Sequence, residues 1–97
     1  MKEKENQENR EIFWKALENH KKNNFQVAKE LYENILQTTP DHFDSIFLLG
    51  SLHLQTKNLS SAEKFLMKAI KINPNHADAH NNLGILFKEL GKFKKAT

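Results

Sequence analysis

One sequence motif occurs twice, as PDHFDSIFLLG at residues 40–50 and as PNHADAHNNLG at residues 74–84. The two copies begin at Pro40 and Pro74, which are 34 residues apart. Proline, histidine, aspartate, leucine and glycine recur at matching places in both versions. Alanine follows the same step over three copies, at Ala28, Ala62 and Ala96. A step shared by so many positions indicates an internal repeat, so we expect a fold built from stacked copies of one unit.

Each unit divides into two helices at its polar breaks. Apolar residues recur at helical spacing over residues 43–55 and again over residues 60–72, which predicts a helix in each range. Pro74 ends the second helix, because proline disfavours a helical conformation at the residue before it. Ser60 and Glu63 have the spacing of a capping box, which predicts that the second helix starts there.

Glycine recurs inside the first helix, at Gly50 and Gly84. Glycine in a helix interior costs about 1 kcal/mol relative to alanine, so its recurrence indicates a compensating close approach of the paired helix. We therefore expect Gly84→Leu to damage folding by forcing two helices apart. His80 is expected to pack inward, because it stands where Ile46 stands in the preceding copy.

The combined spacing resembles the tetratricopeptide repeat, a unit of 34 residues folded as helix, turn and helix. The residues that carry the resemblance are Leu49, Gly50, Ala62, Ala69, Pro74, Leu83, Gly84, Phe87, Gly91, Phe93 and Ala96. The resemblance covers about residues 9–97 and implies an all-α, right-handed superhelical array of antiparallel helix hairpins. It divides the chain into a polar N-terminal lead at 1–8, an atypical capping repeat at 9–42, a second repeat at 43–76, and a third repeat at 77–97 that stops after the start of its second helix.

Composition excludes several classes of function. The chain has 15 basic and 12 acidic residues and a net charge of +3, and its basic residues are lysines except for Arg10. Lysines interspersed with glutamates indicate solvated helix faces more than a surface for nucleic acid. The chain has no cysteine, no signal-peptide pattern in its first residues and no apolar run long enough to span a bilayer. We expect a cytoplasmic protein that binds neither nucleic acid nor membrane.

His76 and His80, with Asp78 between them, have the spacing of a metal-binding pair on one helix face. His76, however, belongs to the turn before the helix, and no third ligand stands at a defined spacing. The chain also has no glycine-framed serine nucleophile and no phosphate-binding loop. We therefore interpret this segment as a joint between repeats, and we expect no metal site, no cofactor and no catalytic residue in this chain.

The resemblance implies that the first helices of the repeats line a concave groove for an extended peptide. It places nine candidate binding residues there, with the two aspartates near the rim: Trp14, Asp44, Phe47, Leu48, Ser51, Asp78, Asn81, Asn82 and Ile85. It places Phe13, Leu17, Gln55 and Lys88 on the same face as their neighbours. The Asn82 amide offers donors and an acceptor, which suits the main chain of an extended peptide. For Trp14 an equal alternative is that its ring covers the open end of the first repeat.

These features predict a scaffold module that binds a protein or an extended peptide. Residues 80–84, HNNLG, also resemble a phrase in tetratricopeptide proteins similar to O-linked N-acetylglucosamine transferase. That resemblance implies an alternative, in which the chain is the N-terminal recognition arm of a larger transferase and catalysis lies outside it. A third possibility is self-association through the face left uncovered after Ala96.

Overall fold

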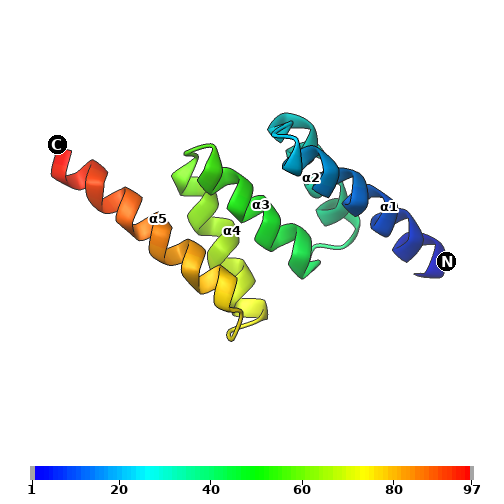
Figure 1. Ribbon diagram of the computed structural model, residues 1–97. Coiled ribbons are helices and arrows are strands. Elements are labelled where there is room, and N and C mark those ends of the chain that lie inside the picture. Colours follow the sequence, from blue (N-terminus) through cyan, green and yellow to red (C-terminus); the bar gives the residue numbers. More distant parts are fainter. Residues whose placement is uncertain (1, 97) are drawn as a thin grey trace.

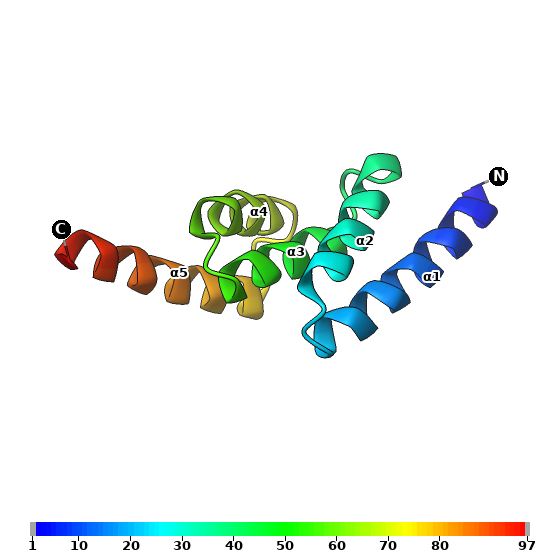
Figure 2. The same cartoon turned by 90° about the horizontal axis from the view of Figure 1, so that it is seen from above.

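The computed structural model describes the backbone of residues 2–96 and the side chains of residues 7–91. Within that range the chain forms five helices and no strand: α1 (Lys2–Lys21), α2 (Phe25–Thr38), α3 (Phe43–Gln55), α4 (Leu59–Ile72) and α5 (Ala77–Ala96). The helices follow one another along an elongated molecule (Figure 1). In the view from above, α2 and α4 lie on one side of the row that α1, α3 and α5 form (Figure 2). This arrangement confirms the predicted all-α array of helix hairpins.

The two hairpin turns are built alike, one repeat apart. Asn23 and Lys57 both adopt left-handed backbone angles, with φ of 65° and 64°. The next amide in each turn donates back across the helix end: the Asn58 N–H donates to the His53 carbonyl at 2.8 Å, and the Asn24 N–H makes the matching bond at the same distance. This pattern is the Schellman ending of a helix, which satisfies the last carbonyls and reverses the chain.

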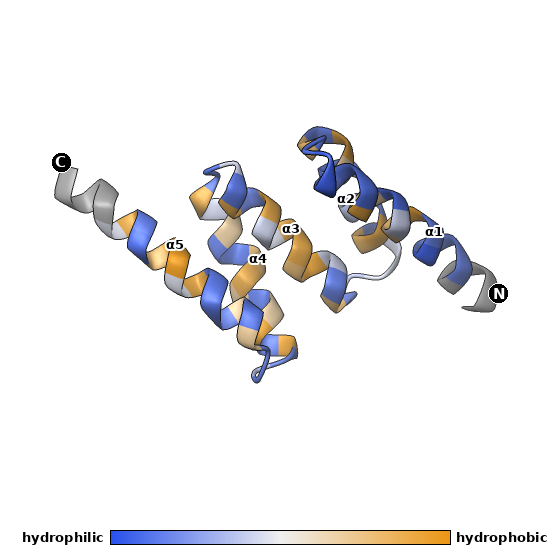
Figure 3. Ribbon diagram, in the orientation of Figure 1, coloured by the Kyte–Doolittle hydropathy of each residue, from blue (hydrophilic) through white to orange (hydrophobic). Residues whose placement is uncertain are grey.

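The core consists of two clusters, and α3 contributes to both. Leu49 and Leu52 pack with residues of α1 and α2, whereas Leu54 packs with residues of α4 and α5. The colouring by hydropathy shows this as apolar residues along α3, in contrast with the largely polar α1 (Figure 3). Because each cluster is shared between neighbouring repeats, a repeat is stabilised by the one beside it.

Gly50 explains one of the recurrent glycines. A Cβ atom at this position would lie 3.0 Å from Leu66 Cγ and 3.2 Å from the Leu66 backbone nitrogen, so even a methyl group would require α4 to give way by a few tenths of an ångström. Gly84 differs, because a Cβ atom there would meet nothing within 4 Å. The prediction that Gly84→Leu damages folding is therefore wrong for this structure, in which no helix within the described part of the chain covers that face of α5.

His80 is a second correction on the same face of α5. Its side chain is exposed, and its Nε2 atom lies 2.6 Å from the Pro74 carbonyl oxygen. Its counterpart Ile46 is fully buried. The inward direction that the repeat assigns to residue 80 leads to solvent, because none of the described helices covers it. Ala79 is the residue of this turn that is buried, at 0% exposure.

The start of α4 also differs from the sequence prediction. The helix begins at Leu59 and its N-cap is Asn58, whose side chain makes no capping hydrogen bond. Ser60 therefore lies within the first turn and does not cap the helix. Leu59 is 8% exposed and belongs to the second core cluster. Burial of this side chain accounts for a helix that begins one residue earlier than the polar pattern indicates.

Helical structure extends further at both ends than the repeat boundaries suggest. α1 begins at Lys2, so it includes most of the residues assigned to the polar lead. α5 continues as one helix to Ala96, through the place where the second helix of the third repeat was expected. The side chains beyond Gly91, including Phe93 and Ala96, lie outside the described residues.

Candidate peptide-binding face

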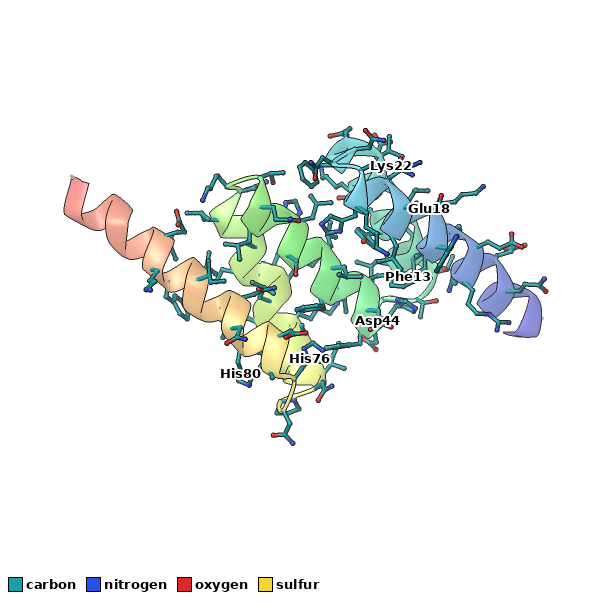
Figure 4. The ribbon with its side chains drawn as sticks, viewed as in Figure 1. Phe13, Glu18, Lys22, Asp44, His76 and His80 are labelled. Carbon is teal, nitrogen blue, oxygen red and sulfur yellow. The ribbon has the colours of Figure 1, made fainter. Side chains whose placement is uncertain are left out.

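The joint histidines are structural, as the sequence predicts. His42 Nδ1 accepts a hydrogen bond from the Ser45 amide at 3.2 Å, and His76 Nδ1 accepts one from the Ala79 amide at the same distance. Each ring thus caps the first turn of the helix that follows it, α3 and α5 respectively. Figure 4 shows His76 and His80 at the start of α5 and Asp44 at the start of α3. Among the described residues, no group of three or more potential ligands could hold a metal ion.

A cleft of about 490 Å³ lies where α1, α3 and α5 meet on one face of the molecule. Seven residues line it: His20, Ser51, Leu54, Gln55, Lys57, Asn82 and Ile85. Polar groups and two apolar side chains are combined here, as in sites that hold a peptide main chain beside an apolar residue. We refer to this space as the α3–α5 cleft.

Asn82 is held in one orientation at the edge of the α3–α5 cleft. Its Nδ2 atom donates to Ser51 Oγ at 2.8 Å, and the Ser51 hydroxyl donates to the Phe47 carbonyl at 3.1 Å. The two bonds fix the Asn82 amide plane against α3. Its Oδ1 atom and second N–H remain for a ligand, one acceptor and one donor, which is the pair that an extended main chain requires.

His20 connects the α3–α5 cleft with the first hairpin. Its Nε2 atom lies 2.5 Å from Gln55 Oε1, and its Nδ1 atom lies 3.0 Å from the Tyr32 hydroxyl. Because Gln55 Oε1 can only accept, Nε2 carries the proton, and in the neutral ring Nδ1 accepts from Tyr32. Burial raises the pKa of Tyr32 to about 12, so this hydroxyl keeps its proton. The relay directs the Gln55 amide nitrogen away from His20 and leaves its donors available.

Lys57 bounds the cleft on the side of the second turn. Its Nζ atom lies 3.3 Å from Glu89 Oε2, so the charge pair joins the α3–α4 turn to α5. The lysine side chain is 64% exposed, and a pair this open to solvent contributes little to stability. Its effect is to place one positive and one negative group at the rim of the cleft.

The structure brings together three of the nine residues predicted for the groove. Ser51, Asn82 and Ile85 line the α3–α5 cleft. Trp14 is 63% exposed and lines a separate shallow hollow on α1. It is therefore not covered by the rest of the first repeat. The remaining five do not line the cleft: Phe47 and Leu48 are half-buried, and Asp44, Asp78 and Asn81 are exposed.

Phe47 and Leu48 have structural contacts that account for their burial. The Phe47 ring stacks on Phe43 with 6.2 Å between centroids and meets the edge of His76 at 4.8 Å. Leu48 packs against the core cluster that contains Leu49 and Leu52. Sequence reasoning missed His20, Leu54 and Lys57 as lining residues. His20 and Leu54 are 34 residues apart, so the repeat itself carried a signal for both of them.

Comparison with known proteins identifies the repeat. The tetratricopeptide repeat family profile matches residues 20–81, more than half of the chain. This chain belongs to the tetratricopeptide repeat family. Its fold is close to that of the O-GlcNAc transferase of Thermobaculum terrenum, with a TM-score of 0.81 and 26% identity over 84% of this chain and 16% of that one. The match confirms the resemblance found in the sequence.

Further relatives of this tetratricopeptide repeat chain are much longer proteins, and the match covers a small part of each. A UDP-N-acetylglucosamine–peptide N-acetylglucosaminyltransferase from Caenorhabditis elegans is 34% identical over 73 residues, which are 75% of this chain and 6% of the relative. A protein O-mannosyl-transferase from the same organism is 31% identical over 69% of this chain and 10% of its own length. The chain thus spans a tenth or less of these relatives. No helix among its described residues combines the length and apolarity needed to cross a bilayer.

Proposed function

We propose that this tetratricopeptide repeat chain is a scaffold module that binds an extended peptide segment of a partner protein in the α3–α5 cleft. The observation that carries the proposal is Asn82, whose amide is fixed by Ser51 at 2.8 Å and presents its remaining donor and acceptor beside the cleft. Hydrogen bonds to a peptide main chain give affinity with little dependence on the ligand's sequence. Leu54 and Ile85 supply the apolar surface for a side chain of the ligand.

Peptide display against the whole chain provides a ligand for the test. Selected peptides are then titrated against Asn82→Ala and against Asn81→Ala, an exposed neighbour on α5 that does not line the cleft. Loss of one or two hydrogen bonds should weaken binding to the Asn82 variant by about tenfold. The Asn81 variant should bind within about twofold, and thermal unfolding should be nearly unchanged in both. Equal affinities of the two variants would rule out the cleft as the binding site.

A second role is favoured by the comparisons. Two relatives are named as transferases that modify proteins or peptides with sugars, and the chain matches a small part of each. The proposal is that the chain acts as an N-terminal recognition arm, which presents a peptide to a catalytic domain elsewhere in the same protein. Sequencing the gene beyond the codon for Thr97 tests this directly. A stop codon at that point contradicts the arm and leaves the binding module intact.

Self-association is the third proposed role, and the uncovered face of α5 supports it. Phe87 is 53% exposed, whereas its counterpart His53 is 4% exposed. Pairing of two such faces would bury the apolar ring in each copy. Sedimentation equilibrium over a range of protein concentrations would detect a dimer that Phe87→Lys abolishes; a monomer throughout the range contradicts it.

The cytoplasm is the compartment we propose, on the basis of the cysteine-free composition.

A further inference from the structure

A second hollow lies at the joint between the first and second repeats, apart from the α3–α5 cleft. It encloses about 390 Å³ and is lined by Asn9, Arg10, Thr39 and His42. These residues come from α1 and from the loop between α2 and α3. All four side chains are polar, in a chain whose other repeat joint is aromatic. We call this hollow the first-joint pocket.

The hydrogen bonds of His42 leave a donor at the first-joint pocket. Its Nδ1 atom accepts from the Ser45 amide at 3.2 Å and lies 2.8 Å from Ser45 Oγ. A backbone amide can only donate, so Nδ1 carries no proton, and in the neutral ring the proton is on Nε2. Phe13 meets the imidazole edge-on, with 5.5 Å between centroids, and helps to hold its plane. Among the described residues, Nε2 has no hydrogen-bond partner.

Asn9 and Thr39 form the floor of the pocket. Asn9 is 9% exposed, and its Nδ2 atom donates to Thr39 Oγ1 at 2.8 Å. Because Thr39 Oγ1 accepts this bond, its own hydroxyl proton is free to donate. Arg10 is exposed and forms no ion pair with any side chain of residues 7–91. The pocket thus combines the Arg10 guanidinium with two neutral donors.

We propose that the first-joint pocket binds a carboxylate, the side chain of an aspartate or glutamate in the partner segment. A guanidinium matches the planar carboxylate with two parallel hydrogen bonds. One cation and two neutral donors balance a single negative charge better than the double charge of a phosphate group. Asp41 and Asp44 are near in sequence but do not line the pocket.

The second joint of the same chain has a different composition. Phe43, Asp44, Asn73 and His76 occupy the positions that correspond to the four lining residues. The Phe43 ring lies against His76, with 4.9 Å between centroids, and Asp44 replaces the arginine with the opposite charge. The second joint should therefore reject the anion that the first one binds, and it serves as an internal control.

The assignment of the carboxylate to a partner segment rests on the proposed function. Arg10 lines both the first-joint pocket and the hollow that contains Trp14, the residue that corresponds to Asn82 two repeats earlier. A segment that leaves the α3–α5 cleft along the first helices would pass Trp14 and bring a side chain to Arg10. The pocket would then select acidic residues at one place in a ligand whose main chain Asn82 holds.

In the test, the isotope-labelled whole chain is titrated with N-acetyl-aspartate amide at constant ionic strength and neutral pH. Binding is monitored by NMR through the backbone amide resonances of Asn9, Thr39 and His42. Saturable shifts are expected at these residues and none at Asn73 or His76. N-acetyl-asparagine amide, which has nearly the same shape without the charge, should produce no saturable shift. Inorganic phosphate should bind no more tightly than the capped aspartate.

Two variants distinguish a specific binding site from general electrostatic attraction of the anion to a positively charged surface. Arg10→Gln should weaken binding of the capped aspartate by about tenfold or more, because it removes the charged partner of the two parallel bonds. Lys21→Gln makes the same change of charge in the last turn of α1 and should change affinity less than about twofold. Equal losses in the two variants, tighter binding of phosphate, or equal shifts at both joints would overturn the proposal.

A third variant separates this inference from the proposed function. Asn82→Ala should leave the titration with capped aspartate unchanged, because Asn82 lies in the α3–α5 cleft and not in the first-joint pocket. If the peptide test fails and the capped aspartate still binds, the proposal for the α3–α5 cleft is rejected and the proposal for the first-joint pocket stands. The reverse result would remove the anion site alone.

Discussion

Helices α3 and α5 have the same place in successive repeats, and they differ in what covers them. Ile46, Gly50 and His53 of α3 are buried, and α4 lies against Gly50 and His53 through Leu66 and Phe65. The corresponding residues of α5, His80, Gly84 and Phe87, are exposed. Figure 1 shows α3 between its neighbours and α5 at the end of the row. The comparison teaches that a repeat pattern specifies a direction for each side chain, whereas burial requires a helix in that direction.

The largest expected effect comes from substituting the same glycine in both helices. Gly50→Leu should lower the free energy of unfolding by about 3 kcal/mol or more, because its Cβ alone would be 3.0 Å from Leu66 Cγ. Gly84→Leu should raise it by about 0.8 kcal/mol, since leucine is the better helix former and a Cβ atom there meets nothing within 4 Å. Urea unfolding followed by circular dichroism measures both.

The opposite signs are the informative part of this pair. Destabilisation by Gly84→Leu of the isolated chain would mean that some group covers α5 in solution, as in a dimer. In that case the loss should shrink on dilution, because the covering surface belongs to a second copy. A loss that does not depend on concentration contradicts both the uncovered face and the dimer.

The turn after α3 and the corresponding place in α5 favour opposite substitutions, each with a smaller effect on stability. Lys57 has a φ of 64° at the end of α3, so Lys57→Gly should stabilise the chain by about 1 kcal/mol, and the exposed pair with Glu89 offsets little of this. Gly91 is the corresponding residue and lies within α5. Gly91→Ala should therefore stabilise as well, by about 0.8 kcal/mol.

Gly91→Ala sharpens the comparison, because the alternative predicts the reverse. If α5 ended at a Schellman turn as α3 does, residue 91 would have a positive φ and alanine would be strained. Chemical unfolding and helical content, measured together, distinguish the two cases. Lower stability and lower helical content in the alanine variant would show that α5 breaks at residue 91.

The smallest expected effect concerns pH and the pair His53 and Phe87. Burial lowers the pKa of His53 below its ordinary value of 6.5, the positive charge of Lys29 lowers it further, and Glu33 partly offsets this. The unfolded chain therefore binds the proton first, and stability contributed by the neutral ring is lost as pH falls below about 6.5. Its ring stacks on Phe65, with 5.6 Å between centroids.

His53→Phe, which copies Phe87 into α3, should reduce this dependence. The free energy of unfolding of the variant should fall less steeply between neutral and mildly acidic pH than that of the parent chain. Phe87→His is the matched control, because an exposed imidazole on α5 pays little desolvation cost on protonation. An unchanged slope in His53→Phe would assign the acid sensitivity to other histidines.

Much of the fold could be predicted from the sequence, because its signals are local. The 34-residue step, the turn before Pro74 and the histidine joints all follow from residues close together in the chain. The start of α4 was placed one residue late, since Ser60 and Glu63 resemble a capping box, while the burial of Leu59 is a tertiary effect. Local polar patterns do not reveal which apolar side chain a neighbouring helix will cover.

The candidate site was less predictable for the same reason. Asn82 was identified from its position in the repeat, but its bond to Ser51 joins residues 31 apart and depends on how α5 packs against α3. His20 contributes to the cleft because the last turn of α1 reaches Gln55, 35 residues away. A sequence pattern gives the face on which such residues lie and not which of them meet.

The sequence by itself determined the repeat length and the pairing of helices in the first two repeats, because helical period and turn chemistry act over a few residues. The tertiary structure decided what covers each face: α4 on α3, none of the described helices on His80 and Gly84 of α5, and the positions of the α3–α5 cleft and the first-joint pocket. Burial, clefts and hydrogen bonds between helices depend on the distance and angle at which separate segments meet. Those quantities arise only when the helices pack against one another.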